Sequence, residues 1–230
     1  MSLREFGPNE LIFILLAARW TILLALIAFV GGGALGMVIA AIRVAPLRPL
    51  RWLATAYIQF FMGTPLLIQL FMAYYGTSLL GYRPDPWVAA ALTFVLNGGA
   101  FFGEIFRGAI EAIPKGQWEA STSLGFRFLR TLRLVIIPQA VRLMLPPTVG
   151  FMVQIVKSTS VASLIGLTEL ARASVQVNTV TFEPVTVFGI ASLIYFLLCW
   201  PLSLYAGYLE RRFAVGVVRK VEPPLVMSAS

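Results

Sequence analysis

Long apolar runs alternate with short charged segments along this chain, and the pattern predicts helices that cross a membrane. The first uncharged run extends from Trp20 to Ile42. At about 1.5 Å per residue, a helix of that length crosses a hydrocarbon core of roughly 30 Å. The run from Val185 to Leu209 is likewise uncharged. Each of these two runs therefore predicts one membrane-spanning helix.

Three further apolar stretches contain polar or helix-breaking residues. One lies within Trp52–Leu80 and contains Gly63-Thr64-Pro65, where we expect a break whose freed backbone groups are satisfied by protein or water. The next extends from Trp87 to about Ala109. The last, from Gln139 to about Leu167, contains Pro146-Pro147, which predicts a bent or split helix. The expected fold class is an all-α integral membrane protein with about five transmembrane helices.

The expected domain organisation is one membrane domain, residues 20–212, between two short flanking segments. The apolar run Leu11–Ala18 is too short to span and is followed by Arg19, so we expect residues 1–19 to lie at the membrane interface and not to form a signal peptide. Residues 213–230 are expected to form a C-terminal tail. Four glycines on the first span predict close approach of a neighbouring helix: Gly31, Gly32, Gly33 and Gly36.

The composition agrees with a membrane domain and excludes several kinds of site. Hydrophobic residues make up 59 % of the chain and the mean hydropathy is +0.85. Charged residues make up 12 %, about half of the roughly 25 % found in soluble domains. Histidine is absent and Cys199 is the only cysteine. These absences exclude His/Cys zinc sites, Ser-His-Asp hydrolases and an intramolecular disulfide.

The net charge of +8 first suggests a nucleic-acid partner, but that interpretation requires a soluble basic face, which such an apolar chain lacks. We expect no nucleic acid, and we interpret the basic residues as contacts to membrane lipid headgroups and as topology signals. Five spans would place these basic residues unevenly on the two sides of the membrane. The side with fewer basic residues has Arg4, Arg19, Arg83 and Arg172. The side richer in basic residues has Arg43, Arg48, Arg51, Arg107, Lys115, Arg127, Arg130, Arg133, Arg142, Arg211, Arg212, Arg219 and Lys220.

Because positively charged loops stay inside, the richer side is expected to be cytoplasmic, with the N-terminus outside and the C-terminus in the cytoplasm. The cytoplasmic loop between the third and fourth spans is expected at about Ile110–Ile137, and the stretch around it, residues 104–140, reads EIFRGAIEAIPKGQWEASTSLGFRFLRTLRLVIIPQA. Pro114 is placed to begin a short helix and Gly125 to end it, since proline favours the first turn and glycine the position after the last. A cytoplasmic partner could bind this projecting helix.

This loop resembles the EAA motif of ABC importer permeases, written EAA, three residues, G, nine residues and I-x-L-P. Glu119 and Ala120 match its opening, Ser121 replaces the second alanine, Gly125 has the expected spacing, and Val135–Pro138 closes it. Other segments resemble permeases of the polar amino-acid uptake type, which serve histidine and glutamine importers: Met62–Leu67, Asn97–Ala100, Glu104–Gly108, Pro114–Ala120, Leu145–Pro147 and Gly166–Leu170.

The resemblance departs from the family pattern at two positions. Met62 stands where arginine is common, and Ser158 stands where an acidic or amide residue usually follows the lysine. The resemblance therefore leaves open which amino acid is carried.

The resemblance implies a type I ABC importer permease fold and a place in the bacterial inner membrane. It also implies four partners: a second permease subunit, ABC ATPase subunits, an extracytoplasmic solute-binding protein and an amino-acid substrate. The chain has no Walker A pattern, so we expect no enzyme activity and no bound cofactor, with ATP and Mg on the ATPase. The expected ATPase-coupling residues are Pro114, Lys115, Gly116, Trp118, Glu119, Ala120, Gly125 and Pro138.

Polar groups inside spans are costly and are functional candidates for that reason. Inter-helix hydrogen bonds remain an alternative for Asn97 and Ser160. Glu104 and Lys157 could instead pair with each other or extend toward the membrane surface. The candidate substrate-path residues are Thr64, Gln69, Asn97, Glu104, Lys157, Thr159 and Ser160.

Two other classes of protein compete with the permease. A secondary transporter would also have broken helices and buried polar groups, but it would normally show inverted repeats and need no docking loop. A membrane scaffold or intramembrane enzyme is the second rival, although no nucleophile stands beside a plausible base. Transport that depends on an ATPase would separate these alternatives.

Overall fold

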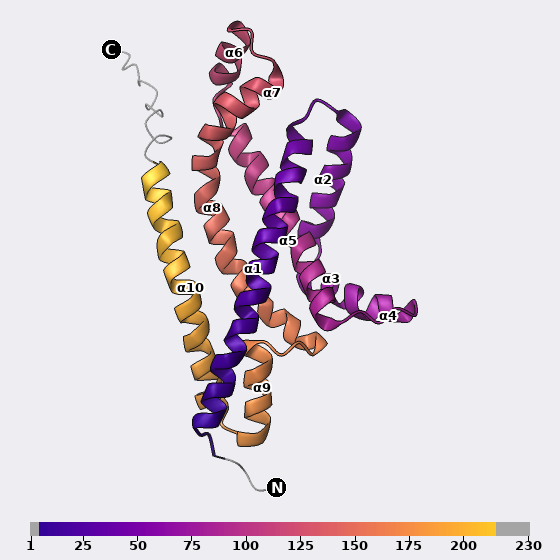
Figure 1. The fold of residues 1–230 in the computed structure, drawn as a ribbon, viewed down its shortest axis with the longest axis vertical. Coiled ribbons are helices and arrows are strands. Elements are labelled where there is room, and N and C mark those ends of the chain that lie inside the picture. Colours follow the sequence, from indigo (N-terminus) through magenta and orange to yellow (C-terminus); the bar gives the residue numbers. More distant parts are fainter. Residues whose placement is uncertain (1–4, 215–230) are drawn as a thin grey trace, which may run out of the picture.

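The computed structural model describes residues 5–214, and every regular element within them is a helix (Figure 1). Four helical stretches are long and apolar enough to cross a membrane, and a bent pair raises the number of candidate spans to five. The all-α fold with about five spans is therefore confirmed. The four are α1 (Pro8–Val44), α5 (Pro86–Glu111), the continuous stretch Phe128–Ile165 that contains α8 (Ile137–Ser158), and α10 (Pro184–Ala214).

The first helix begins earlier than the sequence predicted. Pro8 occupies its first turn, and the Glu10 carboxylate accepts a hydrogen bond from the Gly7 N–H at 3.1 Å, which fixes the helix start. The predicted boundary between residues 19 and 20 therefore falls inside α1. The run Leu11–Ala18 packs against two elements distant in sequence, α9 (Leu170–Thr181) and α10. Hydropathy alone does not show that α9 and α10 pack against this run.

Glycines bring α1 and α5 into direct backbone contact. A Cβ at Gly32 would lie 3.1 Å from the Gly98 Cα, and one at Gly36 would lie 2.9 Å from the Gly103 nitrogen. The predicted packing role is thus confirmed for these glycines and for Gly31, whose Cβ would meet Val95, but a Cβ at Gly33 would meet nothing within 4 Å. This close crossing forms the centre of the bundle.

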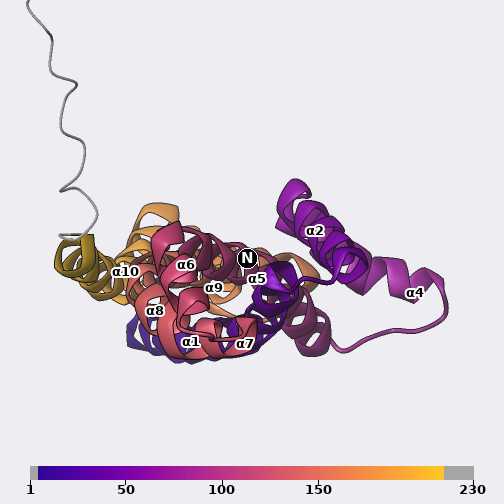
Figure 2. The ribbon, with the colours of Figure 1, turned by 90° about the horizontal axis from the view of Figure 1, so that it is seen from above.

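The second apolar stretch breaks where the sequence predicted. Helix α2 (Arg48–Gly63) ends at Gly63, and α3 (Leu66–Phe71) begins after Pro65, with the two arms bent by 102°. A π-helical turn, Met72–Gly76, and the short helix α4 (Thr77–Leu79) continue the second arm. Seen from above, α2 and α4 extend from one side of the bundle formed by α1, α5, α8 and α10 (Figure 2).

We expected the fourth stretch to be bent or split at Pro146-Pro147, and the structure shows that it is not split there. Both prolines lie inside the unbroken helix α8, consistent with the tolerance of membrane helices for interior proline. The irregular turns lie at its two ends. The short helix α7 (Phe128–Thr131) and a π-helical turn, Leu132–Ile136, lead into α8, and a 3₁₀ segment, Thr159–Ile165, follows it.

The short helices lie at opposite ends of the bundle. Helix α6 (Lys115–Ser123) lies at the same end as the turn between α1 and α2 and the last turn of α10, whereas α9 lies beside the start of α1 (Figure 1). The segments that carry most of the basic residues therefore lie at the same end of the bundle. The tail predicted for residues 213–230 and the basic residues Arg4, Arg219 and Lys220 lie largely outside the described residues.

Candidate functional site

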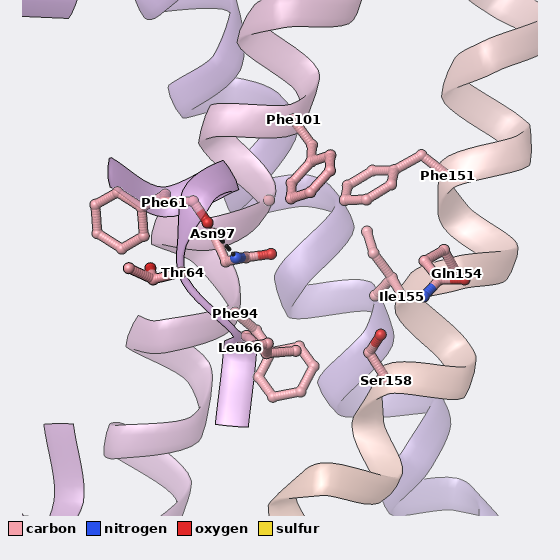
Figure 3. A pocket seen from close by; sticks show the side chains of 11 residues that line it. Phe61, Thr64, Leu66, Phe94, Asn97, Phe101, Phe151, Gln154, Ile155 and Ser158 are labelled. Carbon is pink, nitrogen blue, oxygen red and sulfur yellow. Dashed lines mark hydrogen bonds between the residues drawn. The ribbon is translucent and has the colours of Figure 1, made fainter. Parts of the chain in front are cut away.

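A cavity of about 320 Å³ lies where the break between α2 and α3 faces α5 and α8 (Figure 3). Its volume is at the small end of the roughly 300–1,000 Å³ typical of small-molecule sites. Aromatic side chains occupy much of the wall, and Phe101 stacks on Phe151 with ring centroids 4.8 Å apart. The lining residues are Phe61, Thr64, Leu66, Phe94, Asn97, Gly98, Phe101, Phe151, Gln154, Ile155 and Ser158.

Hydrogen bonds from Gln69 hold the helix break together. Its Nε2 donates to the carbonyl oxygens of Phe61 at 2.8 Å and Thr64 at 3.0 Å, and to the Thr64 hydroxyl at 2.8 Å. These carbonyl groups lost their helical partners at the break, and Gln69 supplies hydrogen-bond donors to them. Gln69 therefore stabilises the wall of the cavity and does not line it.

Asn97 connects the break to α5 and also faces the cavity. Its Nδ2 donates to Gln69 Oε1 at 3.0 Å and to Phe61 O at 3.3 Å, which orients its Oδ1 away from them. Figure 3 shows that oxygen pointing toward the side of the cavity where Gln154 and Ser158 lie. Within residues 5–214, neither of those two side chains makes a hydrogen bond. Three polar groups are therefore free to bind a ligand.

The charged candidates are engaged elsewhere. Glu104 forms a salt bridge with Arg107 on the same helix and lies 3.9 Å from an Arg43 nitrogen on α1. Lys157 does not pair with Glu104, so that alternative is wrong. The lysine instead lines a separate groove of about 480 Å³ against α10, beside Tyr195 and Cys199. Neither charge lines the cavity.

The two hydroxyl candidates after α8 are bonded to their own backbone. Thr159 donates to Val156 O at 2.7 Å, and Ser160 donates to Lys157 O at 2.8 Å. The inter-helix hydrogen bond considered for Ser160 is therefore not the bond observed. Of the candidate substrate-path residues, only Thr64 and Asn97 line the cavity.

Sequence reasoning missed the residues of α8 that line the cavity. Phe151, Gln154, Ile155 and Ser158 follow the three-and-four spacing of one helix face. That periodicity could have been extended backward from Ser158, which stood out in the sequence. Nothing in the sequence shows, however, that this face of α8 faces the break in the second apolar stretch.

The loop helix α6 has the boundaries that the sequence predicted. Pro114 precedes its first residue, and Gly125 adopts φ +76°, a left-handed conformation that favours glycine. The Phe126 N–H donates to Ser121 O at 3.1 Å and the Gly125 N–H donates to Thr122 O at 2.9 Å. This pair of bonds is the Schellman motif, which ends a helix sharply.

One face of α6 is anchored and the other is exposed. Trp118 stacks on Phe128 with centroids 5.9 Å apart and packs against an apolar cluster, Ala109, Ile110, Ile113, Ile136 and Ala140, at the adjoining ends of α5 and α8. Leu124 is 75 % exposed at the end of the helix. The remaining coupling candidates, Lys115, Gly116, Glu119, Ala120, Gly125 and Pro138, are exposed.

A second polar cluster ties the opposite end of the chain together. Glu169 is fully buried at the start of α9, where its carboxylate accepts hydrogen bonds from the Ala171 and Arg172 N–H groups at 3.0 and 2.9 Å. It also accepts from Tyr195 of α10 at 2.9 Å and from Thr21 of α1 at 3.3 Å. Burial raises the pKa of the Glu169 carboxyl, which these hydrogen bonds only partly oppose.

Residues 32–215 match the family described as binding-protein-dependent transport system inner membrane component. The L-cystine transport system permease protein TcyB of Bacillus subtilis (strain 168) is 38 % identical over 84 % of this chain and 83 % of that protein. The arginine transport system permease protein ArtQ of the same organism is 32 % identical over 87 % of this chain and 92 % of that protein.

The fold has relatives among solved structures as well. An amino acid ABC transporter crystallised with histidines superimposes with a TM-score of 0.82 and 30 % identity, over 87 % of this chain and 94 % of that one. The MetNI methionine ABC transporter, at 17 % identity and a TM-score of 0.77, shares the fold. The resemblance to ABC importer permeases is therefore confirmed, and the chain belongs to the family of inner membrane components of binding-protein-dependent transport systems.

Proposed function

We propose that this chain is the permease subunit of an ATP-driven importer of polar amino acids, with its cavity on the translocation path and α6 docking a separate ATPase. The observation that carries the proposal is the position of α6. Its exposed face projects from the basic end of an apolar bundle, while its buried face packs on the helices that line the cavity. Such a helix is available to a cytoplasmic partner.

The packing of α6 supports a mechanism for coupling. Trp118 packs against the apolar cluster to which α5 and α8 both contribute, and these helices also supply Asn97 and Ser158 to the cavity. A displacement of α6 would therefore move both walls. An ATPase can bias the permease only if α6 has a different interaction energy with it in each state. We assign this transmission to the segment Pro114–Leu124.

The partners follow from the family and from the surface of the chain. Only 17 % of the most apolar window of α10 and 11 % of that of Phe128–Ile165 are buried within the chain. A second permease subunit and membrane lipid would cover these faces. An extracytoplasmic binding protein would deliver the amino acid, whereas ATP and Mg would bind to the ATPase and no cofactor to this chain.

The proposed location is the bacterial inner membrane, with the end that carries α6 in the cytoplasm and the N-terminus outside. The uneven distribution of basic residues supports this orientation. The relatives are named as transport permeases for cystine and arginine, which supports amino acids as the class of solute.

Transport in proteoliposomes tests the proposal. The permease is reconstituted with a cognate ATPase and binding protein, and uptake of labelled amino acids is measured with ATP, without ATP and without the ATPase. We expect uptake only when all components and ATP are present. Uptake driven by an ion gradient without the ATPase would favour a secondary transporter, and no uptake under any condition would favour a scaffold.

A further inference from the structure

We infer that the cavity between the helix break, α5 and α8 selects amino acids with uncharged side chains, and that Ser158 is a specificity-determining residue. The inference rests on the proposed function, since it names the class of solute for the same site. Every amino acid brings the same α-ammonium and α-carboxylate groups. Discrimination between solutes in this cavity must therefore come from contacts between the cavity wall and the side chain of the solute.

None of the eleven residues that line the cavity carries a charge. A charged side chain entering it would lose part of its hydration and find no opposite charge, which disfavours its binding relative to a neutral side chain. The nearest ionic groups do not compensate for this loss. Glu104 is bound by Arg107, and Lys157 extends into the groove against α10 although it precedes Ser158 in the chain.

The polar groups present suit a neutral hydrogen-bonding side chain. Asn97 offers an acceptor oxygen from α5, and Gln154 and Ser158 offer donors and acceptors from α8 across the cavity (Figure 3). Since the Gln154 and Ser158 side chains make no hydrogen bond within residues 5–214, both can bind an amide or hydroxyl group of the solute. Neutral donors and acceptors satisfy such groups but cannot balance a full charge.

Four phenylalanines complete the wall: Phe61, Phe94, Phe101 and Phe151. They provide apolar area for the carbon chain of the solute. Their ring faces could attract a cation, but any such attraction also acts on the α-ammonium group that all amino acids share. The aromatic wall therefore does not by itself favour a cationic side chain.

Ser158 is the position where a single substitution should change the preference of the cavity for neutral over cationic side chains. It is the last residue of α8 and lies one turn from Gln154 on the same helix face. A carboxylate there would stand at the cavity wall, opposite Asn97, and would supply the missing partner for a cationic side chain. A matched substitution at Ser163, in the 3₁₀ segment that follows α8, changes the charge outside the cavity.

The test uses the purified permease and ATPase complex without its binding protein, so that only the membrane site selects. Stabilisation against heat is titrated with glutamine, arginine and glutamate for wild type, Ser158→Asp and Ser163→Asp. We expect wild type to bind glutamine at least tenfold more tightly than arginine or glutamate. Ser158→Asp should raise binding of arginine relative to glutamine at least tenfold, whereas Ser163→Asp should behave as wild type.

Two results would overturn the inference: wild type that prefers arginine or glutamate, or an unchanged preference in Ser158→Asp. Either leaves the proposed function intact, because an amino acid is still bound. If none of the three is bound and ATP-driven uptake also fails, the proposed function falls with the inference. If Ser158→Asp does not fold, Gln154→Glu places a carboxylate on the same face and must give the same gain for arginine.

Discussion

Asn97 on α5 donates a hydrogen bond to the amide oxygen of Gln69 on α3, with 3.0 Å between Nδ2 and Oε1. Because Gln69 also binds two carbonyl groups freed at the helix break, this contact helps to fix the bent arm of the second apolar stretch against the central bundle. The cavity thus depends on a side chain that does not line it. This arrangement separates residues that hold the wall from residues that meet the solute.

Replacing Gln69 should weaken the fold, whereas replacing Gln154 should weaken only solute binding. Gln69→Leu removes the hydrogen bond to Thr64 O and one of the two to Phe61 O, and an unsatisfied buried polar group costs roughly 1–3 kcal/mol. We expect a clearly lower melting temperature in detergent for Gln69→Leu and an unchanged one for Gln154→Leu, measured without solute. Equal melting temperatures for both variants would show that Gln69 has no supporting role.

The crossing of α1 and α5 predicts that alanine destabilises the protein at Gly36 but not at Gly33, three residues earlier on the same helix. A Cβ at Gly36 would lie 2.9 Å from the backbone nitrogen of Gly103, whereas one at Gly33 would have no neighbour within 4 Å. Gly36→Ala should therefore force the helices apart at a cost of about 1–3 kcal/mol. Gly33→Ala is the matched control and should be neutral. Thermal unfolding of the detergent-solubilised protein checks both, and similar stabilities would contradict the close crossing.

Local sequence features predicted some parts of this fold well. The break at Gly63-Thr64-Pro65 and the α6 boundaries at Pro114 and Gly125 depend on backbone preferences of those residues themselves. Such preferences operate within one turn, so a sequence shows them directly. Pro146-Pro147 shows the limit of this reasoning, because of the two alternatives, bent or split, the split does not occur and α8 continues through both residues.

Features that depend on distant contacts could not be predicted. The start of α1 is extended because α9 and α10 cover Ile14 and Ala18, and α9 itself contains no long apolar run. In the candidate site, Asn97 and Thr64 were identified as polar groups in spans, but Gln154 was not. Its role depends on which face α8 turns toward the break, and that orientation is set by tertiary packing.

The buried carboxyl of Glu169 predicts a dependence of stability on pH. Burial raises its pKa in the folded state, so the folded protein binds this proton more tightly than the unfolded chain does. The resulting stability is fully present below the unfolded pKa of about 4.3 and is lost as pH rises through the folded pKa. Glu169→Gln should remove this component from the pH profile of thermal unfolding.

Glu183→Gln is the control for that experiment. Glu183 lies at the other end of α9, where its carboxylate accepts a hydrogen bond from the Phe6 N–H at 3.3 Å. Its replacement removes one carboxylate near the same helix and leaves the buried cluster around Glu169 intact. Parallel profiles for wild type and Glu169→Gln would show that Glu169 has the same proton affinity in both states.

The proposed orientation makes a labelling prediction. Gln176 on α9 and Thr122 on α6 are both exposed and lie at opposite ends of the bundle. In a Cys199→Ala background, a cysteine in place of Gln176 should react with an impermeant thiol reagent added to intact cells. One in place of Thr122 should react only after permeabilisation. The reverse pattern would invert the topology and place α6 outside the cytoplasm.

The coupling role of α6 predicts that Gly125→Val uncouples the permease without unfolding it. Gly125 has φ +76° and a Cβ there would meet no neighbour, so the substitution acts only through the backbone. A residue with a β-carbon adopts this conformation at a cost of about 1–2 kcal/mol. The helix would end differently, and Leu124 and Glu119 would shift relative to the ATPase. Co-purification of the ATPase and ATP-driven uptake, at matched membrane levels, should both fall.

Gly81 supplies the matched control because it has the same left-handed conformation, φ +86°, and equally open surroundings. It lies in the turn between α4 and α5, away from α6. Gly81→Val should therefore carry a similar backbone strain, yet leave ATPase recovery as in wild type. If the two variants lose ATPase recovery equally, the loss reflects general strain. If Gly125→Val retains both ATPase recovery and uptake, the ATPase does not depend on the geometry of α6, and coupling must run through another part of the cytoplasmic surface.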